Sequence, residues 1–286
     1  MKMEKIEEEN NWVVEAEQLS YTYEGNEKKA LDGISLKLGR GRKIAFMGGN
    51  GSGKSTLFLC MNGILKPQEG RMLISGRPVE YTRKGLLDVR RKVGIVFQEP
   101  DDQLFSASVF QEISFGILNL GVDEESARKE VEEVIEKLGI TPFRDRPAHA
   151  LSGGQKKLVS IADILVMHPE VLILDEPASS LDPKHRKLVR SIIGQLSESG
   201  MTILMATHDV DYAFAWADEI VLLHEGKVLR QGTPREVCGD AEAMEQANLE
   251  QPAVMRLYRG LVQKGVIDPA GEPPKTIEDL ERRISG

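Results

Sequence analysis

Residues 48–56 read Gly48-Gly49-Asn50-Gly51-Ser52-Gly53-Lys54-Ser55-Thr56 and directly follow the apolar run Lys43–Met47. They match the pattern G-x-x-x-x-G-K-[ST], which is typical of a phosphate-binding loop between a strand and a helix. Glycines let such a loop curl so that successive N–H groups point inward, and the following helix adds the positive end of its dipole. Lys54 is then expected to reach the β- and γ-phosphates of a nucleotide, and Ser55 to offer its hydroxyl to Mg²⁺.

Strand-length runs of apolar residues recur after this loop. They span Val93–Phe97, Val171–Leu174 and Thr202–Ala206. Runs of this kind are expected where a strand is covered on both faces. Helices are predicted between them, over residues 54 to about 65, 123–138, 152–167 and 184–196. Because strands and helices alternate, the sequence predicts an α/β fold built on a mainly parallel sheet.

The two ends of the chain follow other patterns. Trp12–Leu19 and Ile34–Leu38 alternate apolar and polar side chains, which predicts half-buried, antiparallel strands. Residues 219–231 predict a hairpin around Glu225-Gly226. Beyond these residues the strand patterns stop, and Thr233-Pro234-Arg235-Glu236 is typical of a helix start.

These patterns divide the chain into three parts. An acidic tail covers residues 1–11, a main α/β domain covers 12–232 and a helical extension covers 233–286. Within the main domain, residues from about 100 to 165 are rich in helix patterns, which predicts a helical lobe.

Composition excludes several classes of protein. The 286 residues include 37 Lys and Arg against 45 Asp and Glu, a formal net charge of −8, which argues against a surface that coats nucleic acid. Two cysteines rule out a disulfide framework of the secreted type. No run approaches ~18 consecutive apolar residues, and the acidic N-terminus lacks the layout of a signal peptide. We therefore expect a protein of the reducing cytosol that reaches a membrane only through a partner.

Two acidic residues end one of the apolar runs, in Val171-Leu172-Ile173-Leu174-Asp175-Glu176. Asp175 could hold Mg²⁺, directly or through water. Glu176 could accept a proton from an attacking water, as a general base. Taken alone, the pair could equally be solvated groups at a strand end, but the phosphate-binding loop upstream favours the catalytic interpretation.

The segment Leu151-Ser152-Gly153-Gly154-Gln155 opens a predicted helix. Ser152 could be an ordinary N-cap, but a helix N-terminus with two glycines is also an exposed anion site. Combined with the loop and the two acids, this segment resembles the ATP-binding-cassette (ABC) ATPases over residues 12–235. The resemblance implies a P-loop NTPase fold with a mainly parallel sheet core, an antiparallel β subdomain, a helical lobe and a C-terminal helical extension.

The resemblance also implies roles for single residues. Tyr23 resembles the aromatic residue that stacks on adenine, although Tyr21 is a neighbouring candidate and either could simply pack in the core. Gln98 resembles the Q-loop glutamine, which touches Mg²⁺ or water and faces the membrane partner. Asp182, in Ser180-Leu181-Asp182, resembles the D-loop aspartate, and His208 resembles the switch histidine that contacts the γ-phosphate and orients Glu176.

The implied site binds ATP and Mg²⁺ and is shared between two chains. Glu176, His208 and Gln98 are the implied catalytic residues. Ser55, Gln98 and Asp175 are the implied metal ligands. The implied ATP-binding residues are Tyr23, residues 48–56, Ser152, Gly153, Gly154, Gln155 and Asp182. One subunit would give the loop, the two acids and the histidine, and the other would give Ser152, Gly153 and Gly154, so hydrolysis would release the dimer.

A finer resemblance lies in Phe97-Gln98-Glu99-Pro100-Asp101-Asp102-Gln103-Leu104-Phe105, Phe115-Gly116 and Asn119-Leu120-Gly121. These segments resemble the ATPases of energy-coupling-factor importers, which take up cobalt, nickel or vitamins. Gln155-Lys156-Lys157 and residues 274–280 fit the same group. The resemblance implies an ATP-hydrolysing subunit on the cytoplasmic face of the cell membrane. Its partners would be a second ATPase subunit (the same chain or a paralogue), a transmembrane coupling subunit and a substrate-binding membrane subunit.

Other functions remain open at this point. The chain could be the ATPase of a conventional ABC transporter, or a soluble ABC protein acting on DNA or ribosomes. The acidic charge, the single cassette and the lack of a long coiled-coil insertion argue against the soluble class, so no nucleic-acid partner is expected. A P-loop kinase or GTPase would not explain residues 151–155.

The sequence departs from the family pattern at four places. Gly49 stands where the family usually has Pro, and Leu158 where Arg is common. Asp163 occupies a place often filled by a small residue, and Ala178-Ser179-Ser180 replaces the more usual Thr-Ala-Gly. None of these changes removes a phosphate-binding, magnesium-binding or base group.

The extension has two amphipathic segments, and two interpretations of them stay open. The first apolar face consists of Val254, Leu257, Tyr258, Leu261 and Val262. The second consists of Ile277, Leu280 and Ile284. Such helices could cover the end of the cassette sheet, or they could pair with the same helices of a second ATPase subunit.

Overall fold

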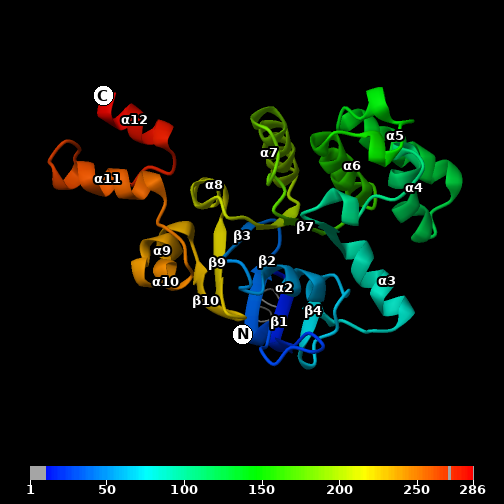
Figure 1. Ribbon diagram of the computed structural model, residues 1–286, viewed down its shortest axis with the longest axis horizontal. Coiled ribbons are helices and arrows are strands. Elements are labelled where there is room, and N and C mark those ends of the chain that lie inside the picture. Colours follow the sequence, from blue (N-terminus) through cyan, green and yellow to red (C-terminus); the bar gives the residue numbers. More distant parts are fainter. Residues whose placement is uncertain (1–10, 270–271, 286) are drawn as a thin grey trace.

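The strands that carry the site belong to one six-stranded sheet (Figure 1). The computed structural model describes residues 11–269 and 272–285. The sheet has the order β10-β9-β3-β8-β7-β6. Its members are β3 (Lys43–Met47), β6 (Val93–Val96), β7 (Val171–Asp175), β8 (Thr202–Ala206), β9 (Glu219–His224) and β10 (Lys227–Gly232). All neighbours pair in parallel except β9 and β10, which form the predicted hairpin. The prediction of a mainly parallel sheet is confirmed.

A second sheet is antiparallel and has the order β2-β1-β4-β5. Its strands are β1 (Trp12–Tyr21), β2 (Leu31–Gly39), β4 (Glu69–Ile74) and β5 (Arg77–Pro78). The predicted antiparallel pairing of the two N-terminal strands is confirmed. The inner face of this sheet shares an apolar core with β3 and with helix α2 (Lys54–Met61). The antiparallel sheet therefore braces the helix that follows the phosphate-binding loop.

Helix α2 is shorter than predicted, because it ends at Met61 rather than near residue 65. The N–H of Asn62 donates to the carbonyl of Phe58 and closes the last turn. The side-chain Nδ2 of Asn62 donates to the carbonyl of Val93 at 2.6 Å. Gly63 then takes a left-handed φ of 75°. A glycine in this conformation just after the last turn is a common helix stop.

Six helices come from the middle of the chain. They are α3 (Arg83–Lys92), α4 (Val109–Asn119), α5 (Glu124–Lys137), α6 (Gly153–Leu165), α7 (Pro183–Glu198) and α8 (Val210–Trp216). Helices α4, α5, α6 and α7 share a core with β7 and β8, whereas α3 packs beside β6 and α8 beside β3 (Figure 1). The helix predicted over residues 123–138 corresponds to α5, which Asp123 caps and after which Gly139 takes a φ of 67°. The short 3₁₀ helices of this region are Pro100–Asp102, Thr141–Phe143 and Ala148–Ala150.

The cores of the lobe and of the sheet are continuous. Ile113 of α4, Val131 of α5 and Ile161 of α6 are fully buried in the same cluster as Leu174 of β7 and Met205 of β8. Each such side chain contributes roughly 1.5–3 kcal/mol when it leaves water. This shared core fixes the start of α6 relative to the strand ends.

The C-terminal segment forms four helices: α9 (Pro234–Gly239), α10 (Ala241–Gln246), α11 (Ala253–Gln263) and α12 (Ile277–Ser285). Val237 and Met244 are buried against Met47 of β3, so α9 and α10 extend the core of the sheet. Helices α11 and α12 each add one buried residue to this core, Val254 and Leu280, and lie at the opposite end of the molecule from α4 and α5 (Figure 1). They expose Leu257 and Ile284, each at 52%. Within the described residues, no helix combines the length and apolarity that crossing a membrane requires.

Candidate functional site

The loop between β3 and α2 can take this shape only with glycine at two of its positions. Gly48 has a φ of 144°, and a Cβ there would lie 2.2 Å from the carbonyl oxygen of Leu223. Gly53 has a φ of 105° and stands as the N-cap of α2 without a side-chain cap. The first N–H groups of α2 are therefore left for a ligand, which is the arrangement that binds phosphate.

Lys54 is held by the loop itself. Its side chain is largely buried, and Nζ donates to the carbonyls of Gly48 at 2.7 Å and Gly49 at 3.1 Å. Burial lowers the pKa of this lysine, while Glu176 and Asp175 act in the opposite direction. The ammonium group is thus fixed beside the loop, where phosphate oxygens could replace the carbonyls as its partners.

Two acids and a histidine come from the ends of neighbouring strands. Asp175 ends β7, Glu176 follows it, and His208 follows β8. Glu176 has a left-handed φ of 44°, and its N–H donates to the carbonyl of Ala206 at 3.1 Å. Because left-handed backbone is uncommon outside glycine, this strained position points to a functional constraint.

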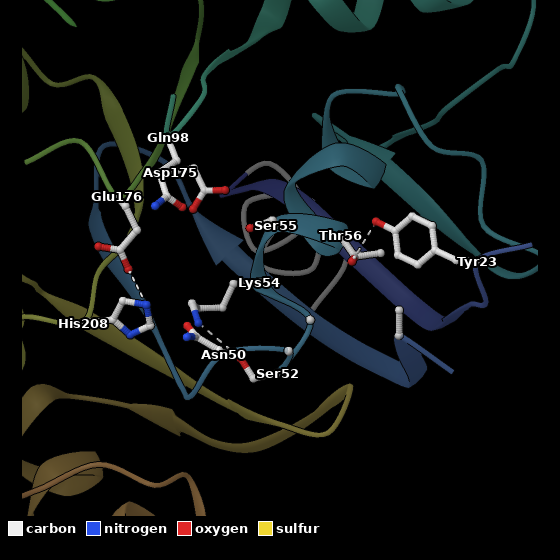
Figure 2. Close-up of a pocket in the computed structure, with 13 residues that line it drawn as sticks. Tyr23, Asn50, Ser52, Lys54, Ser55, Thr56, Gln98, Asp175, Glu176 and His208 are labelled. Carbon is white, nitrogen blue, oxygen red and sulfur yellow. Dashed lines mark hydrogen bonds and ion pairs between the residues drawn. The ribbon is translucent and has the colours of Figure 1, made fainter. Parts of the chain in front are cut away.

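Glu176 and His208 form a close pair (Figure 2). Nε2 of His208 lies 3.1 Å from Oε1 of Glu176, yet that buried oxygen accepts no hydrogen bond from any described residue. Burial raises the pKa of Glu176 to about 7 and lowers that of His208. Near neutral pH the histidine is therefore neutral and the carboxyl group is poised to gain or lose a proton.

These groups line one cavity of about 240 Å³, which we call the strand-end cavity (Figure 2). Its lining comes from the phosphate-binding loop, from residues at or just after the ends of β6, β7 and β8, and from the connection between β1 and β2. The residues are Tyr23, Ala30, Asn50, Gly51, Ser52, Gly53, Lys54, Ser55, Thr56, Gln98, Asp175, Glu176 and His208. The structure thus brings most of the predicted site residues together, and Gly48 and Gly49 contribute through their backbone rather than as lining.

Of the two candidate aromatics, Tyr23 lines the cavity and Tyr21 does not. The hydroxyl of Tyr23 lies 3.2 Å from Oγ1 of Thr56, and the residue as a whole is 38% exposed. Tyr21 meets that ring edge-on at 5.0 Å and packs against the core. Tyr21 therefore supports Tyr23 from behind, which favours Tyr23 as the surface for a planar base.

The cavity offers the donors that Mg²⁺ prefers. Ser55, Asp175 and Gln98 present hydroxyl, carboxylate and amide oxygens to the same space. Across residues 11–269 and 272–285 there is no cluster of three or more His, Cys, Asp or Glu that could hold a metal unaided. Mg²⁺ typically needs only one or two protein carboxylates because substrate phosphates complete its shell. The donor set therefore fits a magnesium ion that arrives with a nucleotide.

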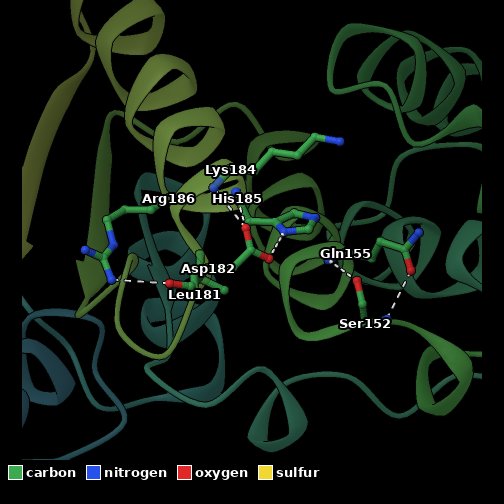
Figure 3. Close-up of polar contacts among 7 residues, drawn as sticks. All are labelled: Ser152, Gln155, Leu181, Asp182, Lys184, His185 and Arg186. Carbon is green, nitrogen blue, oxygen red and sulfur yellow. Dashed lines mark hydrogen bonds and ion pairs between the residues drawn. The ribbon is translucent and has the colours of Figure 1, made fainter.

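The predicted residues at the start of α6 and α7 lie outside this cavity (Figure 3). Residues 152–155, here called the signature turn, form a capping box in which Ser152 and Gln155 satisfy each other's backbone N–H groups. Asp182 caps α7 through the N–H groups of Lys184 and His185. Within one chain, these residues do not meet the phosphate-binding loop.

Lys157 is a site residue whose role sequence reasoning missed. It is buried on α6, and its Nζ donates to the carbonyls of Phe97 at 2.9 Å and Gln98 at 2.7 Å. Burial lowers its pKa to about 8. Lys157 therefore holds the Gln98 segment against the helix of the signature turn. The sequence marked this lysine only by its place in Gln155-Lys156-Lys157, before the apolar part of α6, and did not show its partners.

Three departures from the family pattern have structural explanations. Leu158 is buried in the core of the helical lobe. Asp163 accepts from Nε2 of Gln103 at 2.9 Å, and burial raises its pKa to about 7. Gly49 donates its N–H to the carbonyl of Ala247, just past α10, at 3.2 Å. A proline at position 49 could not make that bond.

Comparisons with known proteins agree with this geometry. The family described as "ABC transporter" matches residues 31–179. The chain is 44% identical over 253 residues to the energy-coupling factor transporter ATP-binding protein EcfA of Methanocaldococcus jannaschii, covering 88% of this chain and 90% of that protein. It is 42% identical over 281 residues to EcfA3 of Clostridium perfringens, covering 96% and 98%.

Solved structures give the same result. The structure of cbiO1 from Clostridium perfringens, described as part of the ABC transporter complex cbiONQ, superposes with a TM-score of 0.72 at 43% identity, covering 89% of this chain and 99% of that one. A dimeric, post-hydrolysis structure of the ATP-binding cassette MJ0796 with ADP and Pi superposes with a TM-score of 0.70 at 27% identity, covering 78% and 99%.

Proposed function

The chain belongs to the energy-coupling factor group of ABC transporter ATP-binding proteins, and from this premise we propose that its ATPase activity powers uptake of a small cargo through a membrane complex. The cargo class is a transition-metal ion, cobalt or nickel, or a vitamin. The observation that carries the proposal is the convergence of Lys54, Glu176 and His208 on one cavity. The first is a fixed cation beside a loop of N–H groups, and the other two are a proton-transfer pair.

Each group in the cavity has a step to perform. Lys54 and the N–H groups of the loop bind the β- and γ-phosphates, and Tyr23 supports the adenine. Glu176 takes a proton from the attacking water, for which a pKa of about 7 is well matched to neutral pH. Neutral His208 orients that carboxylate and contacts the γ-phosphate. Ser55, Asp175 and Gln98 would hold Mg²⁺, which would neutralise charge on the phosphates.

The site is completed by a second subunit. Ser152 and Gly153 are exposed, and the signature turn does not line the strand-end cavity of its own chain. We propose that it closes over the γ-phosphate held by the partner, together with Asp182. ATP then joins the two subunits, and hydrolysis removes the contact that holds them closed.

A mixing experiment tests this sharing directly. Lys54→Ala chains lack a working phosphate-binding loop, and Ser152→Arg chains place a bulky cation where the partner's γ-phosphate must enter. In a hybrid dimer, one of the two sites keeps every motif. The mixture should therefore hydrolyse ATP faster than either variant alone. If hybrids demonstrably form and the mixture is no faster, the shared site is wrong.

The transport role needs a separate experiment. We propose a complex with a second ATPase subunit (another copy or a paralogue), a transmembrane coupling subunit and a substrate-binding membrane subunit, with this chain on the cytoplasmic face. Purification of the tagged chain from detergent-solubilised membranes, followed by identification of its subunits and cargo, checks the assignment. Recovery only with ribosomes or DNA would contradict it.

A further inference from the structure

One side chain joins the start of α7 to the signature turn. Nδ1 of His185 lies 2.5 Å from Oδ2 of Asp182, while Oδ1 accepts from the N–H groups of Lys184 at 2.9 Å and His185 at 3.0 Å. These bonds lower the pKa of Asp182. Because an ionised carboxylate can only accept, Nδ1 carries the proton and donates. Asp182 thus both caps α7 and fixes the direction of the imidazole.

The other side of the ring lies against the signature turn (Figure 3). A Cβ built on Gly154 would lie 2.2 Å from Cδ2 and 2.3 Å from Cγ of His185. The imidazole therefore fills the space that any side chain at position 154 would need. The contact is between the backbone of Gly154 and a ring whose orientation Asp182 sets.

We propose that His185 is a positioning residue that holds the signature turn and the Asp182 segment as one unit. The inference rests on the proposed function, in which both segments act on the nucleotide bound by the partner. Removal of the ring would leave the turn and the helix start free to shift relative to each other. Misplacement by about 1 Å can cost ~10²-fold in rate, so we expect a loss of about tenfold for a partial shift.

The test uses the hybrid dimer that has a single working site. Its first chain carries Ser152→Arg and supplies the loop, and its second chain carries Lys54→Ala and supplies the signature turn. His185→Ala is then added to one chain or the other. In the second chain it should lower kcat about tenfold. In the first chain, whose signature turn is already disabled, it should lower kcat by less than about twofold.

Two further variants separate bridging from folding. His185→Asn keeps an N–H donor for Asp182 without the ring, and His185→Phe keeps a ring against Gly154 without the donor. Each should restore part of the loss when placed in the second chain. Lys187→Ala, on an exposed position of α7, is the matched control and should have no effect in either chain.

The outcomes are distinct. Equal losses from both placements would indicate a general folding role and overturn the proposal, as would no loss from either. The parental hybrid is measured first. If it is inactive although hybrids form, the shared site itself is wrong and the role of His185 falls with it.

Discussion

The strand-end cavity and the signature turn differ in how their polar groups are satisfied. In the cavity, Lys54 and Glu176 are buried beside other ionisable groups, and burial is the main cause of their shifted pKa values. In the signature turn, Ser152 and Gln155 are satisfied by each other and stay near solvent. In the first region, burial of charged groups costs free energy that a bound ligand can offset. In the second region, the polar groups are already satisfied. Under the proposed function, the cavity holds its chemical groups within one chain, and the signature turn acts only on the nucleotide of a second chain.

The largest effect is expected from Glu176→Gln, in the strand-end cavity. The substitution keeps the shape of the side chain but removes the base, so ATP binding should persist while hydrolysis falls by ~10²–10⁴-fold. Turnover at saturating Mg-ATP, together with a separate binding measurement, checks it. Glu198→Gln, at an exposed end of α7, is the matched control. Hydrolysis within threefold of the wild type would remove Glu176 from the chemistry.

Lys54→Ala should affect the same cavity in a different way. Without the ammonium group, the nucleotide phosphate would lose its cationic partner in the cavity. Truncating one partner of a buried charge pair typically costs ~2–5 kcal/mol, so ATP affinity should fall about 30-fold or more. Titration with a fluorescent ATP analogue measures the loss, with Lys187→Ala as the control. An unchanged affinity would contradict the phosphate-loop assignment.

Pairing with a second chain can also be tested in the C-terminal helices. Most of the C-terminal residues in the core of β3 come from α9 and α10, and α11 and α12 add only Val254 and Leu280, so truncation should begin after Glu250. If the exposed Leu257 and Ile284 pair with the same helices of a second copy, the full chain is a dimer without nucleotide. Truncation should then weaken that dimer at least about tenfold, as side-chain burial at 1.5–3 kcal/mol each implies.

Sedimentation at tens of micromolar, without ATP, decides between the two interpretations of the extension. A full-length monomer, or a truncated chain that remains dimeric, would leave α11 and α12 as a cover for the cassette.

The smallest expected effect concerns the pH dependence of stability. Folding raises the pKa of Glu176 from 4.5 to about 7, so this carboxyl group stabilises the folded chain below pH 4.5 and loses that contribution as the pH rises to about 7. Glutamine has no proton to lose. Without nucleotide, Glu176→Gln should melt on the order of 5 °C above the wild type at pH 8, and the difference should shrink toward pH 5. An equal difference at both pH values would mean that burial does not strain this group.

Much of the cavity could be predicted from the sequence because local patterns specify it. The loop at residues 48–56 follows a strand, and the two acids and His208 end strands that proved to be neighbours. The carboxyl ends of adjacent parallel strands meet at one edge, so their terminal residues converge. Strands β4 and β5 of the antiparallel sheet were harder to predict. The apolar and polar residues of β4 alternate weakly, and β5 has only two residues, one of them Pro78.

Residues that act by supporting others were not predictable in this way. Lys157 donates to backbone carbonyls about 60 positions away, and such partners leave no mark in the sequence. The contact of His185 with Gly154 depends on how α6 and α7 pack, which no periodicity within either helix reveals. Tertiary packing, rather than local pattern, decides both.

The hydrogen bond from Gly49 to Ala247 gives the phosphate-binding loop a neighbour on its outer side, only a few residues before α11. A nucleotide that reshapes the loop must either keep this bond or break it. By thermodynamic linkage, if nucleotide binding changes the free energy of this bond, the docking of the chain around Ala247 changes the nucleotide affinity by the same amount. Nucleotide binding in the cavity is thereby coupled to the docking of the segment just before α11, which a second protein could contact.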